Sequence, residues 1–181
     1  MPADHDPQLV SDDYEAAIAA ARAYCATIDA RRTVEFDTFL VAVHRDVSEL
    51  YARTLALALV EIDSSDAEYE SPQTDVWTEL YRDLQSLLGP LDTYREVYHP
   101  YQDEDAITGS LADALATVYE AALRAIAVAE KLPIADAAEA LQLQFGITLG
   151  HHALDVMRAI HAHRFEPGHA PDDSPEAASS S

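Results

Sequence analysis

The residue types most capable of chemistry gather near the C-terminal end of the sequence. Four of the eight histidines lie there, at His151, His152, His161 and His163. Two side chains on one helix can share a metal ion only when they are three or four residues apart, and no pair of these histidines has that spacing. The sequence has no His-Glu-x-x-His motif and only one cysteine, so the common zinc-enzyme signatures are absent.

Mixed pairs are possible in the same segment. Asp155 follows His152 by three residues, and Arg158 follows Asp155 by three. At 100° per residue, His152 lies on one stripe with apolar residues, namely Leu141, Phe145, Leu149, Val156 and Ile160. One interpretation is a buried, hydrogen-bonded His152 beside an ordinary surface pair of Asp155 and Arg158. The other is a cleft where His152 and Asp155 bind a metal, or where His152 acts as a base oriented by Asp155. His151 is expected in solvent. His161 lies at the edge of the apolar stripe, where it could be either buried or exposed.

A second candidate is the acidic run of residues 103–105 with Asp113 beyond it. Carboxylate oxygens suit magnesium or calcium, but the run lacks the alternating spacing and glycine of an EF-hand loop. A solvated run of charge is the favoured interpretation. The sequence also lacks G-x-S-x-G, G-x-x-x-x-G-K and G-x-G-x-x-G, so no motif implies a cofactor.

The elements that must position these residues are all predicted to be helices. Apolar residues recur at spacings of three and four, alanine is abundant and glycine is scarce. The expected helices begin at a Ser11 N-cap and then cover about 34–61, 72–88, 91–98, 111–132 and 133–164, the last bent near Gly146 and Gly150. Ser110 and Asp113 form a near capping box. No strand is expected, and Cys25 is interpreted as a core residue.

These patterns predict an all-α bundle of about six helices. A single domain is expected over residues 11–165, with disordered ends at 1–10 and 166–181. Small residues at Gly146, Gly150 and Ala153 predict a close approach by a neighbouring helix. A homodimer is plausible because helical bundles with an additional apolar face commonly pair.

Composition excludes several classes of function. Eleven basic residues against 33 acidic residues give a formal net charge of −22. This charge repels a phosphate backbone, so nucleic-acid binding is not expected. Hydrophobic residues make up 49% of the chain, which is too many for an acidic disordered protein, and no apolar run approaches the ~20 residues of a membrane span. The N-terminus lacks the pattern of a secretory signal and the lone cysteine cannot form an intramolecular disulfide, which predicts a cytoplasmic protein.

Two stretches of the sequence resemble a known family. The first is Tyr98-His99-Pro100, an acidic loop and Gly109-Ser110-Leu111-Ala112-Asp113-Ala114-Leu115; the second is Gly150-His151-His152-Ala153-Leu154-Asp155-Val156-Met157-Arg158-Ala159-Ile160-His161. They resemble the uncharacterised bacterial family named domain of unknown function 5063, over about residues 34–161. The matching positions are Ser110, Leu111, Asp113, Leu115, Tyr119, Gly150, His152, Asp155, Arg158 and His161.

The resemblance implies a helical fold and no activity. The sequence departs from the family pattern at Ala114, where the family tends to have an aspartate, and at Leu149, where it tends to have an aromatic residue. These departures argue against an acidic catalytic cluster.

Two functions from different classes follow. The favoured one is a non-enzymatic binding or interaction protein, whose acidic surface would suit a protein partner with a basic surface. The alternative is an enzyme that depends on a metal or a small molecule, with its site around His152, Asp155 and Asp113. Arg158 and His161 are further candidates for a ligand or metal site. The sequence names no substrate, partner or metal.

Overall fold

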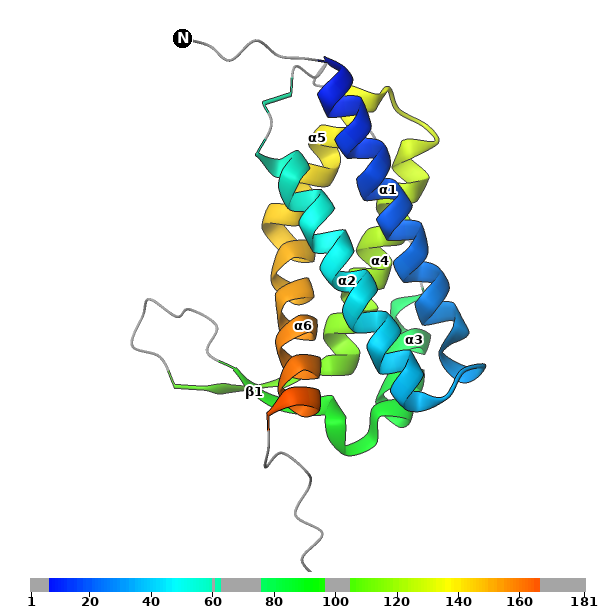
Figure 1. The fold of residues 1–181 in the computed structure, drawn as a ribbon, viewed down its shortest axis with the longest axis vertical. Helices are drawn as coiled ribbons and strands as arrows, with labels where there is room; N and C mark the ends of the chain where they lie inside the picture. Colours follow the sequence, from blue (N-terminus) through cyan, green and yellow to red (C-terminus); the bar gives the residue numbers. More distant parts are fainter. Residues whose placement is uncertain (1–6, 60, 63–75, 97–104, 167–181) are drawn as a thin grey trace, which may run out of the picture.

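Helices dominate the computed structural model, which describes residues 7–59, 61–62, 76–96 and 105–166. Along the chain these are α1 (Pro7–Asp29), α2 (Phe36–Ala58), α3 (Trp77–Leu88), α4 (Leu111–Ala129), α5 (Ile134–Gln144) and α6 (Gly150–Phe165). A π-helical segment, Phe145–Leu149, joins α5 to α6 without a break. Within the described ranges the protein is therefore a bundle of five helical rods (Figure 1), and the predicted all-α class is confirmed.

One predicted helix is wrong. Residues 91–98 were expected to be helical, but Gly89–Asp92 forms a 3-10 turn, η2, and Thr93–Glu96 forms strand β1. β1 pairs antiparallel with β2 (Ile107–Ser110), so the expectation of no strand is also wrong. The segment was predicted to be helical because it lies between Gly89-Pro90 and Pro100, and the sequence does not show pairing with a distant strand; residues 97 and 98 lie outside the described residues. The helix count is consequently one lower than expected.

The other helix boundaries agree better with the sequence. The first helix begins at Pro7 instead of after a Ser11 cap. Ser110 does cap α4, since its hydroxyl accepts from the Asp113 backbone N–H at 3.2 Å. The helix predicted to begin near residue 72 begins at Trp77 and ends at Leu88, the end that was expected; residues 72–75 lie outside the described residues.

The core forms where α1 packs against α2 and α4, while α6 packs against α2 and α4 from the other side. The Tyr24 ring is fully buried, and its hydroxyl donates to the Leu115 carbonyl oxygen at 3.0 Å. Cys25 is buried, as predicted, and burial raises the pKa of its thiol to about 12. Such a thiol stays protonated at neutral pH and serves as a core side chain.

Gly146 and Gly150 were predicted to allow a neighbouring helix to approach closely, and neither glycine does so. Gly146 faces open space, with no atom within 4 Å of an added Cβ. Gly150 donates its N–H to the Phe145 carbonyl oxygen in the π turn, and a Cβ there would lie 2.8 Å from that oxygen. The Phe145 ring also lies over Gly150, 3.1 Å from the added Cβ, and it contacts Tyr51 of α2 with ring centroids 5.3 Å apart. The missing side chain at Gly150 therefore accommodates the π turn itself.

A buried carboxylate fixes the hairpin to the bundle. Asp92, at the end of η2, is 6% exposed. Its Oδ1 accepts from the Ala112 backbone N–H at 2.7 Å and from the Ser110 hydroxyl at 2.8 Å. Its Oδ2 accepts from Gln85 Nε2 at 3.3 Å. Asp92 thus satisfies orphan donors at the N-terminus of α4, where the helix dipole also favours a negative charge.

We expect Asp92→Ala to lower the free energy of unfolding by about 2–3 kcal/mol, because it leaves the buried Ala112 N–H and the Ser110 hydroxyl without their acceptor. Asp92→Asn keeps an oxygen acceptor and is expected to cost about 1 kcal/mol. Urea unfolding followed by circular dichroism measures both values. Equal losses for the two variants would show that hydrogen bonding at Oδ1 is not the dominant contribution.

Candidate functional site

Asp155, rather than His152, is the buried polar residue of α6. The residue is 5% exposed, and its carboxylate accepts from Arg158 Nη2 at 3.0 Å. His151 Nε2 lies 3.4 Å from the other oxygen of this carboxylate. His151 was expected in solvent but is a partner of Asp155, whereas His152 is half-buried with its ring 5.7 Å from the His151 ring. The expected Asp155–Arg158 pair forms, with its acidic member inside the protein.

The remaining predicted site residues lie apart from this pair. Asp113 belongs to the first turn of α4, where its N–H is bound by the Ser110 cap. His161 is exposed, and its ring contacts those of His44 and Phe165, with centroids 6.1 and 5.0 Å away. In the described part of the chain, no three His, Cys, Asp or Glu side chains form a group that could hold a metal ion. The acidic run at 103–104 lies outside the described residues.

A pocket of about 360 Å³ opens between the C-terminal half of α6 and the η2–β1 segment, and we call it the hairpin pocket. Its cationic members are Arg95 of β1 and Arg158 of α6, joined by the titratable His163. The other lining residues are Thr93 and Tyr94, which are polar, and Pro90, Leu91, Ala159 and Ala162, which are apolar. The pocket therefore combines positive charge with an apolar floor.

Each arginine of the hairpin pocket is held by an acceptor. Arg95 donates through Nη2 to the Ala106 carbonyl oxygen at 2.9 Å, and Arg158 donates to the buried Asp155. A guanidinium carries five N–H donors in a planar group, and such a bond fixes the orientation of that plane. Two planar groups that bind oxyanions are thus positioned on opposite walls of one cavity.

The hairpin register places Tyr94 in the pocket wall. Tyr94 pairs with Gly109, and an added Cβ at Gly109 would lie 2.6 Å from Cζ of the Tyr94 ring. The ring therefore occupies the space that a side chain at position 109 would need. Gly109 is required here for this close approach, which keeps the tyrosine against the hairpin.

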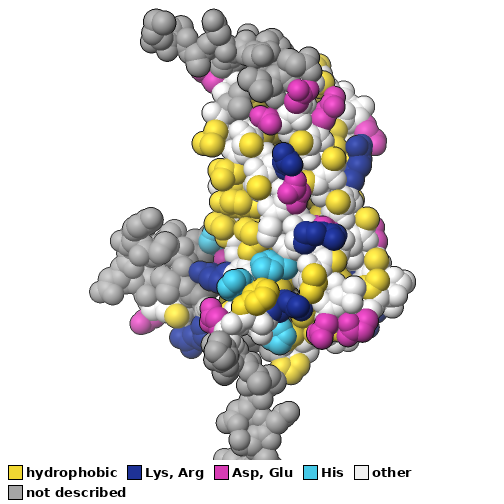
Figure 2. Space-filling view, in the orientation of Figure 1, with side chains coloured by type: hydrophobic (Ala, Val, Ile, Leu, Met, Phe, Trp, Pro, Cys, Tyr) yellow, Lys and Arg dark blue, Asp and Glu magenta, His cyan; other side chains and the backbone are white. Residues whose placement is uncertain are grey.

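Positive and titratable side chains gather at this end of an otherwise acidic protein. The described histidines are His44, His151, His152, His161 and His163, and they lie on α6 or on the facing part of α2. Figure 2 shows histidine side chains in cyan close to Lys or Arg side chains in dark blue, near the level at which the hairpin leaves the bundle. These side chains are concentrated at this end although the formal net charge of the chain is −22.

The fold and the pocket define a small helical-bundle protein with a short β-hairpin beside its last helix. The chain belongs to the family described as Domain of unknown function (DUF5063), whose model matches residues 9–166, so the expected family membership is confirmed. Its fold is similar to that of the crystal structure of protein BF1032 from Bacteroides fragilis. That similarity has a TM-score of 0.72 and 20% sequence identity, and it covers 91% of this chain and 100% of that one. No curated protein matches the chain.

Sequence reasoning missed half of the hairpin pocket. Arg158 was a candidate, but Arg95 and Tyr94 were assigned to a helix that does not exist. The sequence held one weak indication of a strand. Thr93 is β-branched and Tyr94 is aromatic, and both follow the Gly89-Pro90 pair that ends the preceding helix. Only the pairing with β2 brings these residues to α6.

Burial of the His44 ring, followed by the effects of His161 and Arg164, lowers the pKa of His44 below its usual value of 6.5. The unfolded chain therefore takes up this proton more readily, and the free energy of unfolding falls as the pH drops below about 6.5. We expect His44→Gln to reduce this loss while leaving stability above neutral pH little changed. Urea unfolding of both proteins across this range measures the difference. Parallel pH profiles would contradict the assignment.

Proposed function

We propose that the protein is a binding module that holds a small anionic ligand in the hairpin pocket. The observation that carries this proposal is the convergence of Arg95 and Arg158 on one cavity from elements more than sixty residues apart. Two guanidinium groups in one cavity repel each other, and an anion between them removes that repulsion. Arginine is also the side chain best matched to carboxylate and phosphate oxygens.

The apolar floor favours a ligand with a non-polar part. Leu91, Ala159 and Ala162 contribute apolar surface to the lining, and Tyr94 adds an aromatic ring. The volume of about 360 Å³ lies at the lower end of the range for small-molecule sites, which is ~300–1,000 Å³. An aryl or alkyl phosphate or carboxylate of modest size fits both the charge and the volume.

This proposal keeps the non-enzymatic binding protein that the sequence analysis favours. It places the ligand in the hairpin pocket and not around His152. A protein partner with a basic surface remains a prediction that concerns the acidic remainder of the surface, and a homodimer also remains a prediction. Among the described helices, none has the length and apolar character needed to cross a membrane.

Phenyl phosphate is a suitable probe because it joins an oxyanion to a small apolar ring. We expect saturable binding by isothermal titration calorimetry, weakened about tenfold or more by Arg95→Gln, which removes one charge-assisted contact. Affinity should fall as salt is added, because the interaction is electrostatic.

The matched control is Arg53→Gln, which removes an exposed arginine whose Nε lies 2.7 Å from Glu49 on α2, away from the pocket. Its affinity should equal that of the unaltered protein. Arg158→Gln is informative only with a melting curve, since it also removes the ion pair between Arg158 and the buried Asp155. Unchanged affinity in Arg95→Gln would refute the proposal.

A further inference from the structure

Exposed apolar side chains follow the outer side of the last two helices. α5, the π-helical segment and α6 form one continuous helical rod over residues 134–165. Leu143, Ile147 and Leu154 are 64%, 71% and 47% exposed, and their intervals of four and seven residues are close to one and two helical turns. Figure 2 shows hydrophobic side chains in yellow along the edge of the bundle where this rod lies in Figure 1. A contiguous exposed patch of this kind marks an interaction surface. We call these three residues, with Gly146 between them, the α5–α6 patch.

Gly146 leaves a gap in the middle of this patch. It is exposed, and beyond its own helical turn no atom lies within 4 Å of a Cβ added there. Glycine is less favourable than alanine inside a helix, and no other element of this chain uses the space that the missing side chain leaves. The gap therefore lies on the outside of the rod, where the backbone of a second molecule can come close.

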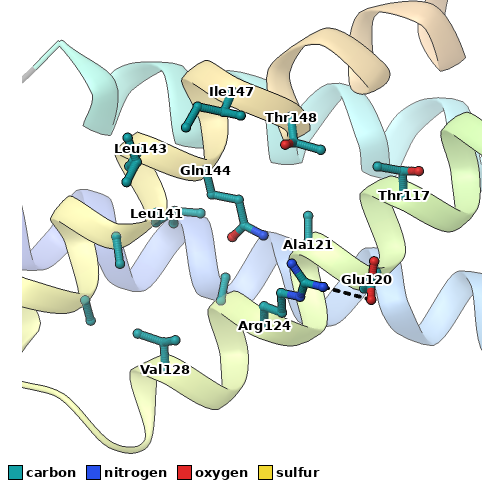
Figure 3. A pocket seen from close by; sticks show the side chains of 13 residues that line it. Thr117, Glu120, Ala121, Arg124, Val128, Leu141, Leu143, Gln144, Ile147 and Thr148 are labelled. Atoms are coloured by element: carbon teal, nitrogen blue, oxygen red, sulfur yellow. Dashed lines mark hydrogen bonds and ion pairs between the residues drawn. The ribbon is translucent and has the colours of Figure 1, made fainter. Parts of the chain in front are cut away.

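Polar groups border the patch on the side of α4. A cavity of about 230 Å³ lies between α4 and the rod, and Leu143 and Ile147 line it from the rod (Figure 3). The polar members of this cavity are Thr117, Glu120 and Arg124 of α4 and Gln144 and Thr148 of the rod. An apolar centre with a polar rim is the usual composition of an interface between proteins.

The patch lies in a stretch of the chain with few carboxylates. The chain has 33 acidic residues, but the only one from position 140 to position 165 is Asp155, which is buried. Arg158 and Arg164 add positive charge to the same helix. Two copies of a chain with a formal net charge of −22 repel each other across most of their surfaces. The stretch without an exposed carboxylate is therefore the surface best suited to the approach of a second copy.

We propose that the α5–α6 patch is the interface between two copies of this chain. In a two-fold dimer the same patch faces itself, so each contact between two residues forms twice. Because Ile147 is the neighbour of Gly146, the Ile147 side chain of each copy can lie in the gap over Gly146 of the other. The patch is thus complementary to itself in shape as well as in charge. The hairpin pocket uses other residues of α6, so this proposal is independent of the ligand proposed there.

Sedimentation equilibrium of the full chain measures the oligomeric state. We expect a mass twice the 19.8 kDa of one chain at about 100 μM protein and about 0.5 M NaCl. The dimer should be weaker at low salt, because the like charges of the two copies are then less screened. A mass of 19.8 kDa under all these conditions would overturn the proposal. A dimer that weakens as salt is added would also overturn it, because that dependence indicates opposite charges across the interface.

Ile147→Glu tests the position of the interface. We expect it to weaken the dimer about a hundredfold or more, because the new carboxylate enters the interface from both copies. The matched control is Val34→Glu, which adds the same charge at a 42% exposed valine between α1 and α2, on the side of the bundle away from α6 (Figure 1). Its dimer affinity should equal that of the unaltered protein. Equal affinities in the two variants would place the interface elsewhere and overturn the proposal.

Gly146→Leu covers the case in which Ile147→Glu perturbs the fold. A Cβ at position 146 has open space in the single chain, and leucine forms helix more readily than glycine. The melting temperature of the dilute, monomeric protein should therefore not fall. Dimer affinity should fall about tenfold or more, because the leucine fills the gap that Ile147 of the second copy needs. Unchanged or higher dimer affinity in the folded Gly146→Leu protein would overturn the proposal.

Discussion

Burial of the Asp92 carboxylate is the constraint on which the hairpin end of the molecule depends. A carboxylate leaves water only where donors replace its hydration, and Asp92 finds them in the Ala112 N–H, the Ser110 hydroxyl and the Gln85 amide. These donors belong to α3, β2 and the first turn of α4. One buried group therefore joins three elements, and it fixes the direction in which β1 leaves η2.

The hydrogen bonds of Asp92 also affect the hairpin pocket. Because β1 begins at Thr93, directly after Asp92, its register with β2 sets the positions of Tyr94 and Arg95. On the opposite wall, the buried Asp155 orients Arg158 in the same way, through a carboxylate that accepts from the side chain facing the cavity. Two buried aspartates thus hold the two sides of the hairpin pocket.

The sequence predicted the rods well because helical periodicity is a local property. The apolar stripes, the Ser110 cap and the buried Cys25 each depend on neighbours within a few residues or on one face of one helix. The hairpin was missed because β1 is defined by hydrogen bonds to residues more than ten positions away, which spacing alone does not reveal. His152 and Ala153 were both compatible with the same stripe, and only packing shows that Ala153 is the fully buried one. The burial of Asp155 was not predicted either. Its partners Arg158 and His151 have spacings that permit contact, but spacing does not show that the contact forms inside the protein.

The most direct test of the anion site is a titration of the isotope-labelled protein with phenyl phosphate, followed by amide NMR shifts. We expect saturable shifts confined to residues 93–95 and to the last two turns of α6, around Arg158 and His163, with the amides of Glu120 and Arg124 unmoved. Shifts that do not saturate, or that saturate only away from the hairpin and α6, would contradict the proposal that the hairpin pocket binds an anion.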